Sequence, residues 1–354
     1  MAFLMARVLV VNAGSSSLKL ALLDGTDEVV DAVTLDDWSG ETEDIKGFAD
    51  RLDRIDAVGH RIVHGGSEFT GPVRLDQSVR DRIAALGELA PLHQPRGVAG
   101  IDTVSAVLPD VPAVACFDTT FHHDLPDAAA TYALPREWNE RWSLRRYGFH
   151  GLSHANIARR VGEVVGQDQR IVSCHLGSGA SLAAIRGERS VDTTMGFTPL
   201  AGLVMATRSG DLDPGLVLWL LDRVDARELS DVLEHHSGLA GLTGGSGDLR
   251  DVTPGSLPWE VYVHRLRREI AAMTAALGGL DVLVFTGGVG EHQPAVRAAA
   301  AEGLAFLGVG ITADANEAGH LDITAPGAAV RTLVIPARED VEIARQVRAA
   351  LGIT

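Results

Sequence analysis

The clearest signal of the fold is VLVVNAGSSSLKLALL, residues 8–23. It begins with a short β-branched run, turns at glycine and serine, and continues with leucine at every second position. A period of two residues is typical of a half-buried strand, so the stretch predicts a β-hairpin. Residues 171–185 repeat this plan around Gly177-Ser178-Gly179, almost half the chain later. The repeat predicts a duplicated domain with a cleft between the two halves.

Other short apolar runs alternate with helical patterns along the whole chain. Strands are predicted at Val8–Val11, Ala57–Val63, Ala113–Phe117, Ile171–His175, Val282–Phe285 and Thr332–Ile335. Helices are predicted at Ser78–Leu89, with Ser78 and Asp81 as a capping pair, and at Ser153–Val165 and Asp340–Leu351. Strands that alternate with helices indicate an α/β fold.

Composition excludes several classes of partner. The 354 residues carry a formal net charge of −16, which argues against nonspecific nucleic-acid binding and against an anionic membrane surface. Two cysteines form no disulfide framework, which favours a reducing compartment. We also expect no signal peptide and no membrane span, and hence a cytoplasmic protein. Length favours two domains, and any anion site needs locally placed positive charge.

Three glycine-rich segments follow predicted strands. In the first, residues 12–19, glycine and three serines precede Lys19, one of only two lysines. Such a turn can form an anion nest, although it lacks the Walker A spacing and an ordinary serine-rich hairpin is the alternative. The segments His175–Ser181 and Thr286–Glu291 are the second and third turns. Three turns of this kind favour a large phosphorylated ligand held by backbone groups.

Two arginines and two acids stand out by their surroundings. Arg61 lies inside an apolar strand and Arg208 lies beside glycine, so either can bind a carboxylate or phosphate in bidentate fashion. A structural ion pair is the alternative for each arginine. Asp118 follows a strand, where acids commonly bind Mg²⁺ or orient a nucleophile. Glu339 precedes the last helix, and the alternative for it is a favourable charge in the first helical turn.

Two other chemistries find little support. The histidine pairs His122-His123 and His235-His236 are adjacent in sequence, and no H-E-x-x-H motif is present, which argues against zinc. No G-x-S-x-G motif occurs, which argues against a serine hydrolase.

Taken in order, the motifs resemble the acetate kinase family, within the superfamily of acetate and sugar kinases, Hsp70 and actin. The matching motifs are N-x-G-S-S-S-x-K at 12–19, H-R-I-V-H-G-G at 60–66, P-L-H-Q-P at 91–95, F-D-T-T-F-H at 117–122, Y-G-F-H-G-L-S-H at 147–154, H-L-G-S-G-A-S at 175–181, D-T-T-M-G-F-T-P-L at 192–200, T-R-S-G-D at 207–211 and T-G-G-V-G-E at 286–291. They extend over essentially the whole chain.

The resemblance implies an α/β fold of the duplicated ribonuclease-H-like (actin-like ATPase) type, with two domains closing around a nucleotide cleft. We expect one domain at 1–124 plus 341–354 and a nucleotide-binding domain at 125–340. The resemblance also implies ATP/ADP as a substrate pair, Mg²⁺ or Mn²⁺ as the cofactor, and a homodimer.

Site residues are carried over motif by motif. Catalytic roles fall on Arg61, Asp118, His150 and Arg208, with Asp118 also a metal residue beside Asn12 and Glu339. The resemblance places the acyl group among Arg61, Val63, Leu92, His93, Phe149 and Pro199. It places the nucleotide among Ser15, Ser17, Lys19, His175, Gly177, Ser178, Gly179, Asp248, Leu249, Arg250, Gly288, Val289, Gly290 and His292.

Four departures from the family pattern lie near the expected nucleotide contacts. Ser178 and His292 each stand where the family usually has asparagine. Leu249 occupies a position that is often aromatic, and Ala337-Arg338 replaces a Thr-Asn pair. The chain is also shorter than most members of the family. The phosphoryl donor is therefore less firmly implied than the reaction class.

The expected reaction is reversible phosphoryl transfer from ATP to acetate, giving acetyl phosphate and ADP. A carboxylic acid with a pKa of about 4.3 is ionised at pH 7, so the nucleophile needs no general base. Propionate or butyrate kinase is the nearest alternative. A nucleotide-gated binding module like Hsp70 or actin is the alternative from another class.

Overall fold

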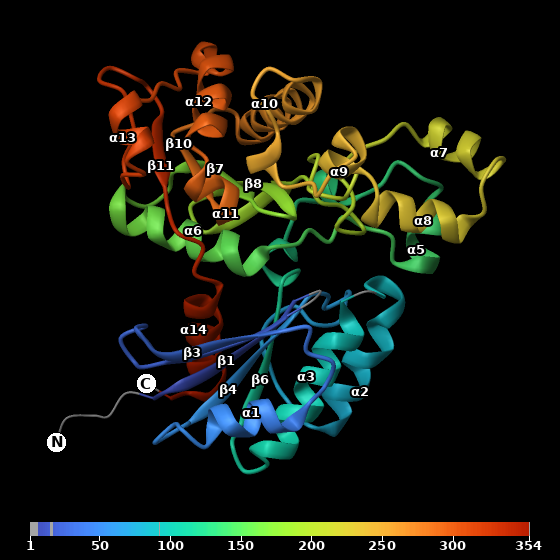
Figure 1. Ribbon diagram of the computed structural model, residues 1–354, viewed down its shortest axis with the longest axis vertical. Helices are drawn as coiled ribbons and strands as arrows, with labels where there is room; N and C mark the ends of the chain where they lie inside the picture. The colour runs from blue at the N-terminus through green and yellow to red at the C-terminus, as the bar shows by residue number, and fades with distance from the viewer. Residues whose placement is uncertain (1–5, 15–16, 92, 354) are drawn as a thin grey trace. The chain divides into compact units, whose positions relative to one another are not determined.

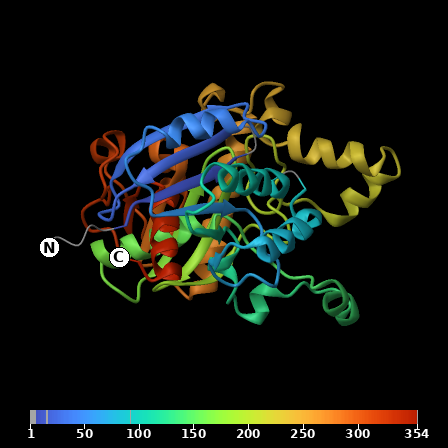
Figure 2. The ribbon, with the colours of Figure 1, turned by 90° about the horizontal axis from the view of Figure 1, so that it is seen from below.

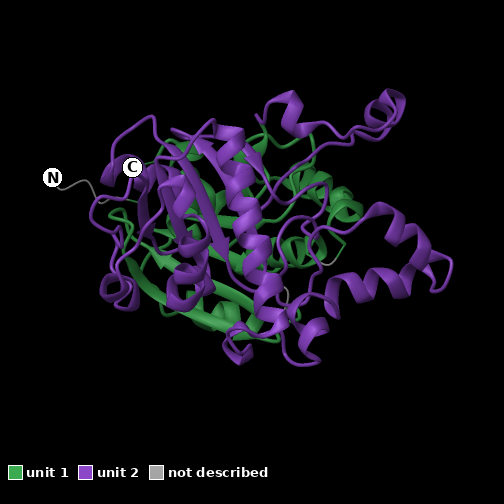
Figure 3. Cartoon of the chain, turned by 90° about the horizontal axis from the view of Figure 1, so that it is seen from above, with its two compact units in different colours: residues 1–123, 151–156, 338–354 green, residues 124–150, 157–337 purple. Residues whose placement is uncertain are grey.

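The computed structural model describes residues 6–14, 17–91 and 93–353. The chain divides into two compact units, coloured separately in Figure 3. The first comprises residues 1–123, 151–156 and 338–354, and the second comprises residues 124–150 and 157–337. Residues 151–156 thus belong to the first unit, whereas the sequence placed them in the second domain.

The first unit is built on a six-stranded sheet in the order β3-β2-β1-β4-β6-β5, of which β1, β3, β4 and β6 are labelled in Figure 1. Its strands are β1 (Val8–Ala13), β2 (Ser17–Leu23), β3 (Val29–Asp36), β4 (Ala57–Ile62), β5 (Val73–Arg74) and β6 (Ala113–Phe117). Strands β1, β2 and β3 form antiparallel pairs, and β1, β4 and β6 run parallel. The carboxyl ends of those three parallel strands therefore meet at one edge of the sheet.

The second unit repeats this arrangement. Its strands are β7 (Arg170–Leu176), β8 (Ala180–Arg186), β9 (Arg189–Thr193), β10 (Val282–Thr286) and β11 (Arg331–Val334). Their order is β9-β8-β7-β10-β11, with β7, β8 and β9 antiparallel in sequence order and β7, β10 and β11 parallel. The hairpins β1–β2 and β7–β8 occupy equivalent places, which confirms the predicted duplication.

All six predicted strands are present, with ends that shift by at most two residues. The first predicted helix differs from the prediction in two ways. It is α2 (Gln77–Ala85) followed by a separate 3₁₀ turn at Leu86–Leu89. Its N-cap is Asp76, whose side chain accepts a hydrogen bond from the backbone N–H of Val79 at 2.8 Å, so the Ser78 and Asp81 capping pair was wrong. Aspartate is a preferred N-cap residue because its carboxylate accepts from such N–H groups.

The helices lie in the connections between strands, apart from α14, which follows the last strand. They are α1 (Thr42–Ala49), α3 (Gln94–Val107), α4 (Asp127–Ala130), α5 (Arg136–Trp142), α6 (Gly151–Val164), α7 (Pro214–Leu221), α8 (Ala226–His235), α9 (Gly238–Thr243), α10 (Leu257–Leu277), α11 (Gly287–His292), α12 (Pro294–Gly303), α13 (Ala313–Glu317) and α14 (Glu339–Leu351). Further 3₁₀ turns lie at Thr120–His122, Leu249–Asp251 and Ala305–Leu307. Among the described residues, no helix has both the length and the apolar character that crossing a bilayer requires.

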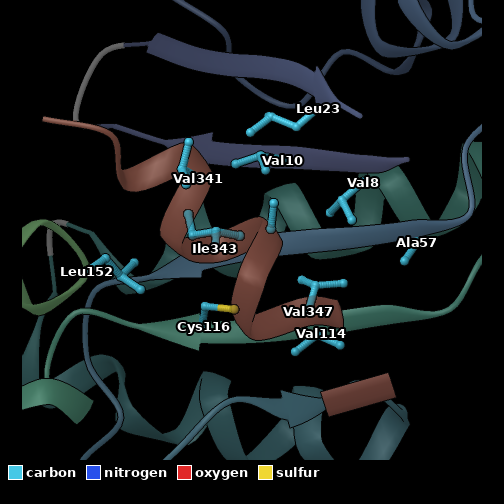
Figure 4. Packing of buried hydrophobic residues seen from close by; sticks show 11 residues of the cluster. Val8, Val10, Leu23, Ala57, Val114, Cys116, Leu152, Val341, Ile343 and Val347 are labelled. Atoms are coloured by element: carbon cyan, nitrogen blue, oxygen red, sulfur yellow. The ribbon is translucent and has the colours of Figure 1, made fainter. Parts of the chain in front are cut away.

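Helix α14, the last element of the chain, belongs to the first unit and covers its sheet. Figure 2 shows it beside the N-terminal strands. Its apolar stripe packs on residues from β1, β4 and β6 (Figure 4). The approach is close, because a Cβ on Gly59 would lie only 2.5 Å from Cγ2 of Ile343. Gly352 ends the helix in the left-handed conformation, with φ of 64°. The packing fixes the start of α14, and with it Glu339, relative to the strand ends.

A buried histidine in β4 makes stability depend on pH. His60 is 1 % exposed, its Nε2 has no hydrogen-bond partner among the described residues, and burial lowers its pKa from 6.5 to about 3. The unfolded chain therefore takes up a proton below pH 6.5 while the folded chain does not, so stability falls as the pH drops from 6.5 towards 3. Burial also lowers the pKa of His64, to about 4, and that side chain adds to the same trend.

We expect His60→Leu to reduce this acid sensitivity by about 1.4 kcal/mol per pH unit between pH 6 and 4. Urea unfolding of both proteins at a series of pH values measures the slope. Equal slopes for the variant and the wild type would mean that His60 is not held neutral.

Candidate active site

Four polar side chains meet at the carboxyl edge of the first sheet. Asn12 and Arg61 are paired in the register of β1 and β4, and Asp118 directly follows β6. Arg61 donates from Nη2 to Oδ2 of Asp118 at 2.6 Å and from Nη1 to Oδ1 of Asn12 at 3.0 Å. The Nδ2 group of Asn12 donates to Oε2 of Glu339 at 3.4 Å. We call these four residues the acidic cluster.

Burial and charge oppose each other in the acidic cluster. The Asp118 side chain is 1 % exposed, whereas those of Arg61 and Glu339 are each 16 % exposed. Burial works against the charged form of Arg61, but Asp118 and Glu339 outweigh burial and raise the pKa of Arg61 above its usual value. Burial also raises the pKa of Asp118, and Glu339 acts in the same direction while Arg61 opposes it. Two carboxylates against one guanidinium leave an excess of negative charge that favours a further cation.

Asp118 is held in place by a glycine. The N–H of Gly151, at the start of α6, donates to the carbonyl oxygen of Asp118 at 2.8 Å. A Cβ at Gly151 would lie 2.2 Å from that oxygen, so only glycine permits this approach.

We therefore expect Gly151→Ala to destabilise the protein by about 1–3 kcal/mol, because the backbone of Asp118 must move. Gly162→Ala in the same helix is the matched control, since its Cβ meets only the flexible side chain of Gln167. Urea unfolding compares the two variants. A Gly151→Ala protein as stable as the Gly162→Ala protein would show that the close approach is not required.

A second cluster lies in the second unit around the β7–β8 turn, and we call it the histidine–arginine cluster. The rings of His150 and His175 are stacked with centroids 4.3 Å apart, and Nδ1 of His150 lies 3.0 Å from Oγ of Ser181. His150 has φ of 55°, a left-handed conformation that sets its direction before α6 begins. A Cβ at Gly179 would lie 3.5 Å from both the His150 ring and Nη1 of Arg208. Glycine therefore lets the turn approach both side chains.

Arg208 differs from Arg61 in its partners. Burial lowers the pKa of Arg208, and only the more distant charge of Glu234 opposes this shift. Within the described part of the chain, the Arg208 guanidinium makes no ion pair and no hydrogen bond. A partly buried guanidinium without a counter-ion, next to a glycine-rich turn, is suited to binding an anion. The alternative of a structural ion pair therefore applies to Arg61 and not to Arg208.

The remaining predicted acyl-pocket residues are divided between the units. Val63 and His93 belong to the first unit and are half-buried, with His93 at the start of α3. Phe149, which is buried, and Pro199, which is half-buried, belong to the second. Leu92 lies outside the described residues. The grouping of these side chains into one pocket stays a prediction.

The predicted nucleotide residues fall on four segments. Ser17 and Lys19 lie on β2, with Lys19 exposed, and Ser15 lies outside the described residues. The turn Gly177–Gly179 follows β7, at whose end His175 lies, and the Ser178 carbonyl accepts from the N–H of Ala206 at 3.0 Å. The role of these turns in binding the nucleotide stays a prediction.

The other two segments show features that the sequence did not predict. Asp248 and Arg250 bind each other, which lowers the pKa of Asp248 to about 2, while Leu249 between them is buried. The third glycine segment was predicted as a turn, and it begins the short helix α11. Within it Gly288 and His292 are exposed, Val289 is half-buried and Gly290 is buried.

The sequence analysis also missed two side chains that support α11, namely Arg297 of α12 and Glu291 of α11 itself. Arg297 is 1 % exposed and donates from Nη1 to the carbonyls of Gly290 and Glu291, each at 2.8 Å. Glu291 accepts from two backbone N–H groups, those of Gly287 and Ala337. The one available signal was the charge of these residues beside a glycine-rich segment, and such charges are most often on the surface.

The metal candidates consist of oxygen donors. Among the described residues, no three His, Cys, Asp or Glu side chains gather in a way that could hold a metal ion. Asn12, Asp118 and Glu339 instead offer an amide oxygen and two carboxylates, which are ligands that Mg²⁺ accepts when water or phosphate oxygens complete its shell. Their excess negative charge, beyond the charge of Arg61, fits a cation of this kind.

The comparisons with known proteins agree with the motifs. The model of the acetokinase family matches residues 43–345. The chain is 44% identical over 356 residues to acetate kinase of Nostoc punctiforme, an alignment that covers 96% of this chain and 87% of that protein.

Two solved structures resemble the whole chain. Acetate kinase of Porphyromonas gingivalis has a TM-score of 0.89 at 33% identity, and a propionate kinase of Francisella tularensis has a TM-score of 0.91 at 32% identity. Each comparison covers 98% of this chain and 100% of the other. They confirm the predicted fold class. By the family match and these identities, the chain belongs to the acetokinase family.

Proposed function

We propose that the protein catalyses reversible, Mg²⁺-dependent phosphoryl transfer from ATP to acetate. An acetate oxygen forms a bond to the γ-phosphorus, and the bond from that phosphorus to the β,γ-bridging oxygen breaks. The products are acetyl phosphate and ADP. The observation that carries the proposal is the unpaired Arg208 guanidinium beside His150 and the Gly177–Gly179 turn. Family membership supports the same reaction, since the relatives above are named as kinases of acetate or propionate.

The chemical difficulty of this reaction is the repulsion between anions. The acceptor is already ionised at pH 7, because carboxylic acids of this type have a pKa of about 4–5. No base is therefore needed to remove a proton from the acceptor. The residues must instead offset the charge on the carboxylate and the triphosphate, and stabilise the charge of the transferring phosphoryl group.

The histidine–arginine cluster is suited to the phosphoryl group. Arg208 can donate two parallel hydrogen bonds to phosphoryl or carboxylate oxygens, and His150 can add one from its Nε2. The contact between Nδ1 of His150 and Oγ of Ser181, at 3.0 Å, orients the imidazole for that purpose. The N–H of Gly177 donates to the carbonyl of Gly179 at 3.0 Å, so the N–H groups of Ser178 and Gly179 are the ones that could contribute donors to the phosphates, in line with the predicted role of this turn.

The acidic cluster is suited to the metal and the acceptor. Mg²⁺ bound there would neutralise phosphate charge and favour in-line transfer. Asn12, Asp118 and Glu339 would hold the ion, and Arg61 keeps Asp118 oriented at 2.6 Å. When the ion takes over part of the negative charge, Arg61 can turn its free donors to the acceptor carboxylate. Asp118 is thus a metal residue and not a general base.

The choice of acceptor rests on the apolar side chains Val63, Leu92, Phe149 and Pro199, and acetate is our first choice. Propionate is the second, because the chain is about as similar to the Francisella tularensis propionate kinase as to the Porphyromonas gingivalis acetate kinase. The test is the rate of acyl hydroxamate formation with ATP, Mg²⁺ and hydroxylamine for acetate, propionate and butyrate. We expect the highest kcat/KM with acetate. Product from butyrate alone would contradict the acetate assignment.

We further propose that the protein is a homodimer in the cytoplasm, as the family resemblance implies. The thiols of Cys116 and Cys174 are both buried and unpaired, which is compatible with a reducing compartment. Helix α7 has no buried residue and exposes Leu216, Leu218, Trp219 and Leu221, an apolar surface of the kind that subunits cover. Light scattering of the purified chain tests the dimer, and a monomer at micromolar concentration would contradict it.

A further inference from the structure

One carboxylate joins two backbone segments of the second unit. Oε1 of Glu291, in α11, accepts hydrogen bonds from the N–H of Gly287 at 3.0 Å and from the N–H of Ala337 at 2.9 Å. Gly287 is the first residue of α11, and Ala337 follows the end of β11. A shift of either segment must therefore break a charge-assisted hydrogen bond or move Glu291.

The first segment is the part of α11 that carries the predicted nucleotide contacts. Gly287 has φ of 77°, and a Cβ there would lie 2.7 Å from the carbonyl oxygen of Leu176. The first residue of α11 is therefore in close contact with the backbone at the end of β7. Gly288 and His292, two of the predicted nucleotide residues, are exposed. Glu291 thus fixes the inner side of the helix whose outer residues are expected to meet the nucleotide.

The second segment leads to a predicted metal residue. Ala337 is the last residue of the second unit, and Glu339 begins α14 two residues later. Beyond this point Arg338 donates to Asp340 at 2.9 Å and to the carbonyl of Asp27 at 3.1 Å. The chain passes from the second unit to the first between residues 337 and 338. It is therefore anchored on both sides of this boundary, by Glu291 before it and by Arg338 after it.

We propose that Glu291 is a positioning residue that couples the nucleotide-binding helix α11 to the placement of Glu339, and so couples nucleotide binding to Mg²⁺ binding. The inference rests on the proposed function, because it takes the roles of α11 and Glu339 from there. Glu291 need not touch either ligand. It acts through the two backbone N–H groups that its Oε1 atom joins.

Arg297 provides the matched comparison. It also holds α11, through the carbonyls of Gly290 and Glu291, and it bonds to Asn316 of α13, but within the described chain it makes no hydrogen bond with residues 335–340. A loosened α11 is thus common to Arg297→Met and Glu291→Ala. Loss of the connection to Glu339 is expected of Glu291→Ala alone.

The experiment measures ADP binding by calorimetry, with EDTA and with Mg²⁺, for the wild type, Glu291→Ala, Glu291→Gln and Arg297→Met. For each protein, the ratio of the ADP affinity with Mg²⁺ to the ADP affinity with EDTA is the Mg²⁺ enhancement. This ratio measures the coupling between the two ligands. We expect both Glu291→Ala and Arg297→Met to weaken binding in EDTA. Glu291→Ala should lose the enhancement by about fivefold or more, Glu291→Gln should lose less because it keeps an acceptor oxygen, and Arg297→Met should keep it.

Hydrogen exchange adds a readout that does not depend on the ligands. The peptide containing Ala337 should exchange faster in Glu291→Ala than in the wild type and should be unchanged in Arg297→Met. An unchanged Mg²⁺ enhancement in Glu291→Ala and Glu291→Gln, or its equal loss in Arg297→Met, would overturn the coupling.

Acetyl phosphate formation by the wild type separates this result from the proposed function. A wild type that forms acetyl phosphate while the variants keep the enhancement would overturn the coupling alone. A wild type that binds no ADP and forms no acetyl phosphate would contradict both.

Discussion

Arg208→Ala is expected to lower kcat/KM for acetyl phosphate formation by about 10²–10³, with little change in stability. The loss follows from removal of a fixed cation that stabilises charge on the transferring phosphoryl group. Stability should hold because the guanidinium has no ion pair within the described residues, so its removal leaves no buried carboxylate unpaired. Burial already lowers the pKa of Arg208, which is a cost that the variant no longer bears.

The hydroxamate assay and urea unfolding measure the two effects separately. Arg208→Lys keeps the charge but loses the planar fork, so it should recover only part of the activity. Arg136→Ala is the control, because Arg136 has a 91 % exposed side chain in a helix-surface ion pair of the same unit. Turnover near that of the wild type in Arg208→Ala would remove the residue from the site.

Arg61→Ala is expected to abolish most activity and also to destabilise the protein by about 3–5 kcal/mol. Arg61 is the bidentate partner of Asp118, whose side chain is 1 % exposed. The variant leaves that carboxylate buried without its partner, and burial then raises its pKa further above the unfolded value. The folded variant would keep a proton on Asp118 at pH values where the unfolded chain has lost it. The deficit in stability should therefore shrink as the pH falls towards 4.

A double variant separates the two roles of Arg61. Asp118→Asn in the Arg61→Ala background removes the orphaned charge, so it should restore stability without restoring activity. Urea unfolding at pH 7 and pH 5 measures the stability of the single and double variants, and the hydroxamate assay measures their activity. Full activity in Arg61→Ala, or an equal stability loss in the single and double variants, would contradict these roles.

The fold was largely predictable because its signals are local. Short apolar runs predicted all six strands, and the paired glycine-rich hairpins predicted the duplication. The helix at Gln77–Ala85 shows the limit, since Ser78 and Asp81 suit a capping pair yet Asp76 provides the cap. When polar residues within three positions of one another could each cap a helix, the sequence alone does not tell which of them does, because the choice depends on the backbone conformation.

The candidate site was predictable in its residue types and less so in its partners. That Arg61 pairs with Asp118 depends on β4 and β6 being neighbours, which no local pattern states. The same holds for Glu291, which reaches Ala337 only because β10 and β11 are adjacent. Arg208 and Arg61 looked alike in sequence, and only the structure separates the ion-paired arginine from the unpaired one.

Above all, we propose that the γ-phosphoryl group of ATP is transferred to a carboxylate oxygen of acetate. ³¹P nuclear magnetic resonance of the protein with ATP, Mg²⁺ and acetate follows the reactants and products together. We predict that acetyl phosphate and ADP appear in equal amounts, and that ATP is regenerated when acetyl phosphate and ADP are supplied instead. Formation of ADP with inorganic phosphate and no acetyl phosphate, or no reaction of ATP at all, would contradict the claim.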